Sequence, residues 1–198
     1  VTGHNNLALG NLAGFNVTSG SCNIMLLTSI GNLSGSNNIF MGCYAGKSGT
    51  SGERNILLGL HAGCSLTEGG CNISIGEQAG KKITTGHRNI VIGSGAGEGI
   101  HHDELSTGSC NILLGFQVDA PIGTGDHQLT IGAGTSTWIS GTSAFMVGIG
   151  TTNPSSRLSV AGDACVSGVI TATNFAKADG SSLGGFSQDS QGNLIAGT

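Results

Sequence analysis

The chain has 198 residues, a formal net charge of -4 and 37 glycines, and only 9% of its residues are charged and 4% aromatic. This composition argues against an ordinary globular core, against collagen and against disorder, because the glycines follow no three-residue period and 37% of the residues are apolar. The sequence has no Lys/Arg run that could neutralise phosphates and no apolar stretch of roughly 20 residues, so we expect neither a nucleic-acid partner nor membrane insertion.

A five-residue unit, Asn-Ile-x-x-Gly in its commonest form, recurs along most of the chain. Its asparagine is taken as the origin of each repeat, and other positions are counted from it. The origins are Asn6, Asn23, Asn38, Asn55, Asn72, Asn89, Asn111 and, as a substituted eighth, Gln128. Five of the seven intervals are 17 residues long; the interval before Asn38 is shorter and the one before Asn111 longer. A degenerate ninth unit, beginning at Ala144, covers residues 144–148, so the repeats predict a rod over residues 1–148.

Within each unit, large aliphatic residues stand at positions +1 and +3, whereas the residue at +2 changes from unit to unit. This period of two predicts a strand whose +1 and +3 side chains face the interior. Glycine recurs at +4 and at -3, where it suits a turn or the close approach of a neighbouring coil. The unit therefore predicts an all-β fold, a repetitive β-solenoid or β-roll with 17-residue rungs.

Stacked rungs place like residues on like residues. In the three most regular rungs we expect ladders of Asn55, Asn72 and Asn89, of Ile56, Ile73 and Ile90, and of Leu58, Ile75 and Ile92. Each rung buries only about four aliphatic side chains, worth about 1.5 to 3 kcal/mol each, against about 1 to 2 kcal/mol of backbone entropy per residue. The remaining stabilisation must come from contacts and hydrogen bonds between stacked rungs. We expect further burial between chains, most simply in a homotrimeric fibre, intertwined or side by side.

The pattern changes after residue 148. Residues 149–186 hold two short alternating runs, Leu158 to Val160 and Val166 to Thr173, which predict a junction with short strands. The run "GNLIAG" at 192–197 again places an asparagine four residues before a glycine, so residues 187–198 predict the start of a further repeat array or a tail. Because the sequence also begins within a repeat, we expect a fragment of a longer chain.

The rungs of residues 1–148, with Asn-x-x-Ile-Gly units and Ala-Gly corners, resemble the β-roll heads of YadA-like trimeric adhesins. The YadA-type unit is commonly shorter. The same rungs joined to "VGIGTTNPSSRLSVAGDACVSGVITATNF" at 147–175 look more like tail-fibre and related virion proteins of phages, especially cyanobacterial ones. This resemblance implies a homotrimeric fibre on the virion surface, used for host attachment. The alternative is a bacterial trimeric-autotransporter-like surface adhesin or an extracellular filament protein.

The resemblance also implies the partners. They are further copies of the chain itself, other virion or fibre proteins, and a host surface receptor that is a glycan or an outer-membrane component.

Titratable residues are densest in the insertion before Asn111. His101, His102, Asp103 and Glu104 could supply ligands to a metal ion, particularly where three copies meet near an axis; the alternative is a solvated loop. The six cysteines have no CxxC spacing, and we interpret them as small apolar fillers.

We expect no enzyme activity and no cofactor. The carboxylates are spread over turns, and the sequence has no nucleophile-elbow, zinc-protease or phosphate-loop motif. Asp103 with Glu104 is a starting point for a depolymerase hypothesis. Thr/Ser pairs at the turns raise a third hypothesis, binding to ice or another flat surface, but Thr67-Glu68 and Gly123-Thr124 interrupt the row. We therefore predict a structural and adhesive protein.

Overall fold

The computed structural model describes residues 2–26, 33–49, 51–99 and 105–167, together with two short strands further on. Its contacts divide the chain into two compact units, Val1–Asp163 and Ala164–Thr198. The first unit therefore extends past residue 148, where the repeats placed the end of the rod. In the second unit, β12 (Phe186–Gln188) pairs antiparallel with β13 (Leu194–Ala196). The strand within "GNLIAG" is thus part of an antiparallel pair, not of a parallel rung.

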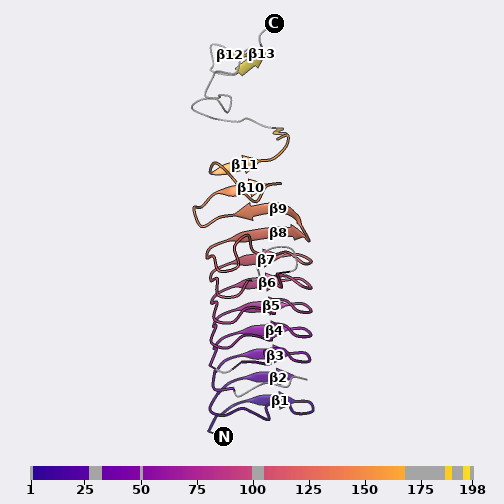
Figure 1. Ribbon diagram of the computed structural model, residues 1–198, viewed down its shortest axis with the longest axis vertical. Helices are drawn as coiled ribbons and strands as arrows, with labels where there is room; N and C mark the ends of the chain where they lie inside the picture. The colour runs from indigo at the N-terminus through magenta and orange to yellow at the C-terminus, as the bar shows by residue number, and fades with distance from the viewer. Residues whose placement is uncertain are drawn as a thin grey trace. The chain divides into compact units, whose positions relative to one another are not determined.

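The repeats form eight strands of one sheet, which lie one above another (Figure 1). They are β1 (Leu7–Leu9), β2 (Ile24–Leu26), β3 (Ile39–Met41), β4 (Ile56–Leu58), β5 (Ile73–Ile75), β6 (Ile90–Ile92), β7 (Ile112–Leu114) and β8 (Leu129–Ala133). Each strand pairs in parallel with the next, position on position. No helix occurs among the described residues. The predicted all-β fold, a β-solenoid with rungs of about 17 residues, is confirmed.

The origin asparagines form a buried hydrogen-bonded ladder along the stack. The Asn72 backbone N–H donates to Asn55 Oδ1 at 2.9 Å. The Asn72 side-chain amide donates to the same oxygen at 3.2 Å and to the Gly86 carbonyl of the next rung at 2.8 Å. Asn72 is 1% exposed. Because a buried amide without partners is costly, this fully bonded ladder specifies the register of the rungs.

The recurrent glycines have two separate roles. At position -3 the coils approach closely: a Cβ on Gly69 would lie 2.3 Å from the Gly86 carbonyl oxygen. At position +4 the backbone bends with a positive φ, which is 130° at Gly76. Side chains are excluded from the first position by contact, and from the second both by conformation and by contact, since a Cβ on Gly76 would lie 2.7 Å from the Gly93 carbonyl oxygen.

The interior of the solenoid is lined by position +2, not by positions +1 and +3. Six strand-centre residues are at most 1% exposed: Met25, Phe40, Leu57, Ser74, Val91 and Leu113. The five apolar ones share one core with alanines at +7 and aliphatic residues at +11, which include Ala62, Ala79, Leu66 and Ile83. The predicted orientation of the strands is therefore wrong, because alternation defines two faces but does not say which one is inside.

The aliphatic residues at +1 and +3 lie on the outer face of the sheet. They are half-buried or exposed, and the exposed fraction of Ile92 is 38%. The narrow interior faces Ala and Asn positions of the same coil, so it accepts a single column of strand side chains of varied size. The constant Ile/Leu rows thus remain on the surface of the chain.

The regular stack ends at Gln128. Its Oε1 accepts from the Ile122 N–H at 2.9 Å, and its Nε2 donates to the carbonyls of Ile122 at 2.7 Å and Gly125 at 2.9 Å. The side chain is one methylene longer than asparagine and folds back onto its own rung. The last rung is thereby satisfied without a following one.

The chain reverses direction after β8. It turns through Gly134, at φ 55°, into β9 (Ser136–Gly141), which runs antiparallel to β8. β10 (Val147–Ile149) is antiparallel to β9, and β11 (Leu158–Val160) is parallel to β10. The predicted ninth rung at residues 144–148 is wrong, since β10 lies beside β9 and the hairpin separates it from β8.

The corner before each origin has a left-handed backbone without glycine. Position -1 has φ between 57° and 62° in all eight rungs, at Asn5, Cys22, Asn37, Arg54, Cys71, Arg88, Cys110 and His127. Asparagine tolerates this conformation, but for most other residues it costs about 1 to 2 kcal/mol. These corners carry side chains at a conformational cost.

The cysteines are not core fillers. All six are free, four are exposed and two are half-buried. Three of them, Cys22, Cys71 and Cys110, stand at the left-handed corner. The interpretation of cysteine as a small apolar residue of the interior is wrong, because the small interior positions are filled by alanine.

Candidate functional site

The insertion before Asn111 is described only at its edges. His101, His102, Asp103 and Glu104 lie outside the described residues. Just before the residues that are not described, the Gly99 N–H donates to Asp119 Oδ1 at 2.8 Å. Within the part of the chain that the structure describes, no three His, Cys, Asp or Glu side chains form a group that could hold a metal ion. A metal site in the insertion stays a prediction.

The structure brings the expected ladder residues into register. Asn55, Asn72 and Asn89 are joined by side-chain hydrogen bonds. Ile56, Ile73 and Ile90 lie opposite one another, as do Leu58, Ile75 and Ile92. The six aliphatic side chains form two apolar rows across β4, β5 and β6. We call this surface the outer Ile/Leu face.

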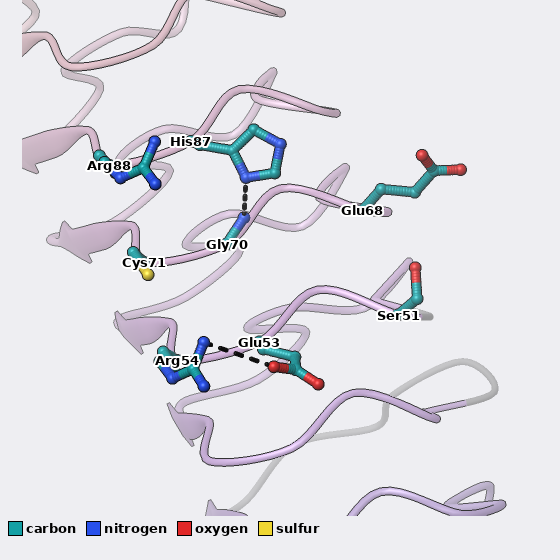
Figure 2. Close-up of a pocket in the computed structure, with 8 residues that line it drawn as sticks. All are labelled: Ser51, Glu53, Arg54, Glu68, Gly70, Cys71, His87 and Arg88. Carbon is teal, nitrogen blue, oxygen red and sulfur yellow. Dashed lines mark hydrogen bonds and ion pairs between the residues drawn. The ribbon is translucent and has the colours of Figure 1, made fainter.

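A hollow of about 260 Å³ opens at the rung corners before β4, β5 and β6 (Figure 2). Its lining residues are Ser51, Glu53, Arg54, Glu68, Gly70, Cys71, His87 and Arg88. Figure 2 shows Arg54, Cys71 and Arg88 one above another beside the strands, with Glu68 and Ser51 across the hollow. Gly70 lies between, so we call this feature the Gly70 hollow.

The hollow interrupts a second ladder, at position -2. There a side chain accepts the backbone N–H of the preceding rung: Ser36 Oγ from Ser21 at 3.0 Å, and Asp126 Oδ1 from Ser109 at 2.7 Å. Gly70 has no side chain with which to accept from Glu53. Among the described residues, the Glu53 N–H has no hydrogen-bond acceptor.

The opposite edge of the hollow continues the same ladder. His87 Nδ1 accepts the Gly70 N–H at 2.9 Å. In a neutral imidazole this bond leaves the proton on Nε2, which is then a free donor at the surface. The hollow is therefore bordered by the His87 ring on one rung and, among the described residues, by an unpaired backbone donor on the rung below the glycine.

Charge is divided across the hollow. Arg54 and Glu53 form an exposed pair at 3.5 Å, with side chains 66% and 48% exposed; such a pair contributes about 0 to 1 kcal/mol. Within the described residues, the Arg88 guanidinium and the Glu68 carboxylate form no ion pair. The chain has only three arginines, and two of them line this hollow. The strand side thus carries both arginines, one of them paired with Glu53, and the opposite side offers the acceptor oxygens of Glu68 and Ser51.

In two other surface regions, the polar side chains already contact other residues of the chain. The Tyr44 ring stacks on His61, with centroids 4.9 Å apart, and Lys47 Nζ lies 5.1 Å from the Tyr44 centroid. Thr67 Oγ1 donates to the Thr84 carbonyl of the next rung at 3.2 Å. These rings and turn hydroxyls serve the stack, which weakens the case for a flat Thr surface.

Comparison with known proteins gives no assignment. No protein-family model, curated protein or solved structure matches this chain. In the described ranges no helix is long and apolar enough to cross a membrane. The resemblance to phage tail fibres and YadA-like adhesins remains an expectation from the sequence.

The most constant positions of the repeat did not predict the Gly70 hollow. The signal was present at positions -1 and -2, where Arg54, Cys71 and Arg88 follow Glu53, Gly70 and His87 in three successive rungs. The pair Gly69-Gly70 puts a glycine at position -2, where the neighbouring rungs have larger residues. Aligning these columns would have identified the gap between Glu53 and His87.

Proposed function

We propose that the chain is a structural and adhesive rod segment of a homotrimeric fibre, a phage tail fibre used for host attachment. The observation that carries this proposal is the outer Ile/Leu face. A β-solenoid whose most constant aliphatic columns point outward has a long apolar surface that one chain does not cover. Large exposed apolar surfaces on soluble proteins mark sites of association.

A second and a third copy are suitable occupants of this face. The face repeats with the rungs, so a partner with the same repeat matches it along its whole length. Closed cyclic symmetry lets identical faces cover one another around an axis without leaving an open end. Each aliphatic side chain that becomes fully buried contributes about 1.5 to 3 kcal/mol, which supplements the thin core of a single rung.

Rigidity and length support the proposed attachment role. Parallel rungs about 4.7 to 4.9 Å apart make a stiff spacer, and the chain has many corners at which side chains can vary without disturbing the interior. We propose that this rod lies on the virion surface, next to other fibre proteins, and contacts a host glycan or outer-membrane component.

The oligomeric state is the direct test of this proposal. Size-exclusion chromatography with light scattering is expected to give three times the chain mass of 19.6 kDa. Replacing Ile73 and Ile90 together by arginine should yield monomers with an unchanged circular-dichroism spectrum, because both side chains lie on the outer face. Glu77→Arg, at an exposed turn of the same stack, is the control. A wild-type monomer contradicts the proposal.

A further inference from the structure

We propose that the Gly70 hollow binds an acidic sugar, with the sugar carboxylate on the arginine side and the hydroxyls on the glutamate side. The hollow lies where the side-chain ladder at position -2 is broken: side chains accept the backbone N–H of the preceding rung below it, at Ser21 and Ser36, and above it, at His87, Ser109 and Asp126. Among the described residues, neither the Ser36 N–H nor the Glu53 N–H has such a partner, because the Glu53 carboxylate pairs with Arg54 and Gly70 has no side chain. The Glu53 backbone N–H, which faces Gly70, is a donor at this break that has no acceptor among the described residues.

The chain itself shows what can accept at this position. Three rungs further on, the Asp126 carboxylate stands in the same column and accepts the Ser109 N–H at 2.7 Å. A ligand carboxylate placed over Gly70 would accept from Glu53 in the same way. The carboxylate is therefore a group that this backbone geometry already accommodates.

Two arginines stand on either side of that position. Arg54 is one rung before Cys71 and Arg88 one rung after it, in the same column. With a rung spacing of about 4.7 to 4.9 Å, both guanidinium groups are within reach of a carboxylate between them. Guanidinium binds carboxylate through paired, charge-assisted hydrogen bonds.

The opposite wall excludes a simple inorganic anion as the best ligand. Glu68 and Ser51 offer acceptor oxygens there, and the Glu68 carboxylate, together with the Glu53 carboxylate beside Arg54, repels a compact anion. Hydroxyl groups donate to such oxygens, so the wall suits a ligand that carries hydroxyls beside its carboxylate. A volume of about 260 Å³ lies below the roughly 300 to 1,000 Å³ of sites for drug-sized ligands. It suits a single sugar ring, a uronate unit of a longer glycan.

The binding site does not depend on the number of chains in the fibre. Only the source of the sugar, a host surface polysaccharide, rests on the proposed attachment function. The two ideas can therefore fail separately.

Calorimetric titration of the whole chain tests the ligand. The probe is a glucuronate oligosaccharide, compared with a glucose oligosaccharide of the same length and a glutamate-rich peptide of equal charge. We expect saturable binding of the uronate, at least about tenfold tighter than of the neutral sugar, because the charge-assisted bonds are lost with the carboxylate. Equal binding of the neutral sugar overturns the carboxylate site. Equal or tighter binding of the peptide overturns the sugar assignment.

Gly70→Ser tests the hollow without removing a charge. Serine occupies the same position in other rungs, at Ser21, Ser36 and Ser109. A Cβ at Gly70 would lie 3.7 Å from the Glu53 nitrogen and 3.1 Å from the Glu53 carbonyl oxygen, so a small shift admits it. The new hydroxyl should accept the Glu53 N–H, leave the melting temperature equal or higher, and abolish uronate binding. Unchanged binding in this variant overturns the proposal.

Arg88→Gln and Lys47→Gln form a matched pair. Both remove one positive charge, but Lys47 lies beside Tyr44 and outside the hollow. We expect uronate binding to weaken about tenfold in Arg88→Gln and to be unchanged in Lys47→Gln. Equal weakening in both variants would identify non-specific attraction and overturn the site. Light scattering on the same samples keeps the trimer question apart: monomers that bind uronate contradict the fibre, and trimers that do not bind contradict the site.

Discussion

The interior of the rung stack and its outer corner both have a uniform backbone, but they differ in how much their side chains vary between rungs. Inside, seven rungs have the same residue, an asparagine whose amide links its neighbours. At position -1 the backbone is equally uniform, with φ near 60°, yet the side chains are Asn, Cys, Arg and His. Register is therefore set by the interior, and the corner is free to vary. Changes to the interior asparagine ladder should cost the most stability, whereas changes at the corner should alter the surface and change stability only slightly.

Asn72→Ala should have the largest effect. It removes the amide that donates to Asn55 and Gly86 and the oxygen that accepts the Asn89 N–H. Each buried group left without a partner costs about 1 to 3 kcal/mol, so we expect a loss of about 3 to 5 kcal/mol. Urea unfolding measures it. Asn11→Ala, at an exposed turn, is the control; equal losses in the two variants would contradict a special role for the ladder.

Gln128→Asn tests how the ladder ends. Asparagine is too short to reach both Ile122 backbone groups, which would lose their partners. We expect a loss of about 1 to 2 kcal/mol in the free energy of unfolding, smaller than for Asn72→Ala because the bond to Gly125 can be kept. An unchanged denaturation midpoint would show that the fold-back adds nothing at the last rung.

Ser74→Ala should stabilise the interior. Ser74 is 0% exposed at position +2, between Leu57 and Val91 in the column, and its hydroxyl has no hydrogen-bond partner in the described structure. Removing an unsatisfied buried hydroxyl gains about 1 kcal/mol. The increase should appear in the thermal midpoint, whereas exposed Ser48→Ala should leave the midpoint unchanged.

Cys110→Asn should give the smallest gain, at the corner. Cys110 has φ 60°, and Asn5 and Asn37 occupy the same position with φ 57° and 62°. Asparagine pays less than cysteine for this conformation, so we expect a gain of about 0.5 to 1 kcal/mol. Cys43→Asn, where φ is not positive, should give no gain in the same melting experiment. A gain at both sites would mean that the corner conformation is not the cause.

The repeats predicted the rung length and the strand register, but they did not predict which face of each strand lies inside. A constant interval places Ile73 opposite Ile90, because parallel rungs of equal length can pair only in that register. The inner face was missed because hydrophobicity marks both faces: Val91 is buried at +2, and Ile90 and Ile92 beside it are equally apolar. Only the size of the interior decides between them, and size is a property of the closed coil.

The candidate site could be predicted less well for a different reason. Its defining feature is the lack of a side chain at Gly70, and one more glycine among 37 attracts no attention. Its importance comes from the residues above and below it in the stack, Glu53 and His87, which are 17 positions away in either direction. Functional residues in a solenoid are neighbours across rungs, so columns must be compared with the same care as motifs along the chain.

The fold-back of Gln128 has a consequence for how such rods acquire their length. The side-chain oxygen of an origin asparagine accepts a hydrogen bond from the next rung, as Asn72 does from Asn89. The side-chain oxygen of Gln128 instead accepts from Ile122 of its own coil. One methylene group thus separates a rung that propagates from a rung that terminates. Duplication or loss of a coil between two asparagines would preserve the asparagine ladder and change the length by about 4.7 to 4.9 Å. The length of such a rod can therefore change in evolution by whole rungs, and a single substitution of asparagine by glutamine can end the ladder.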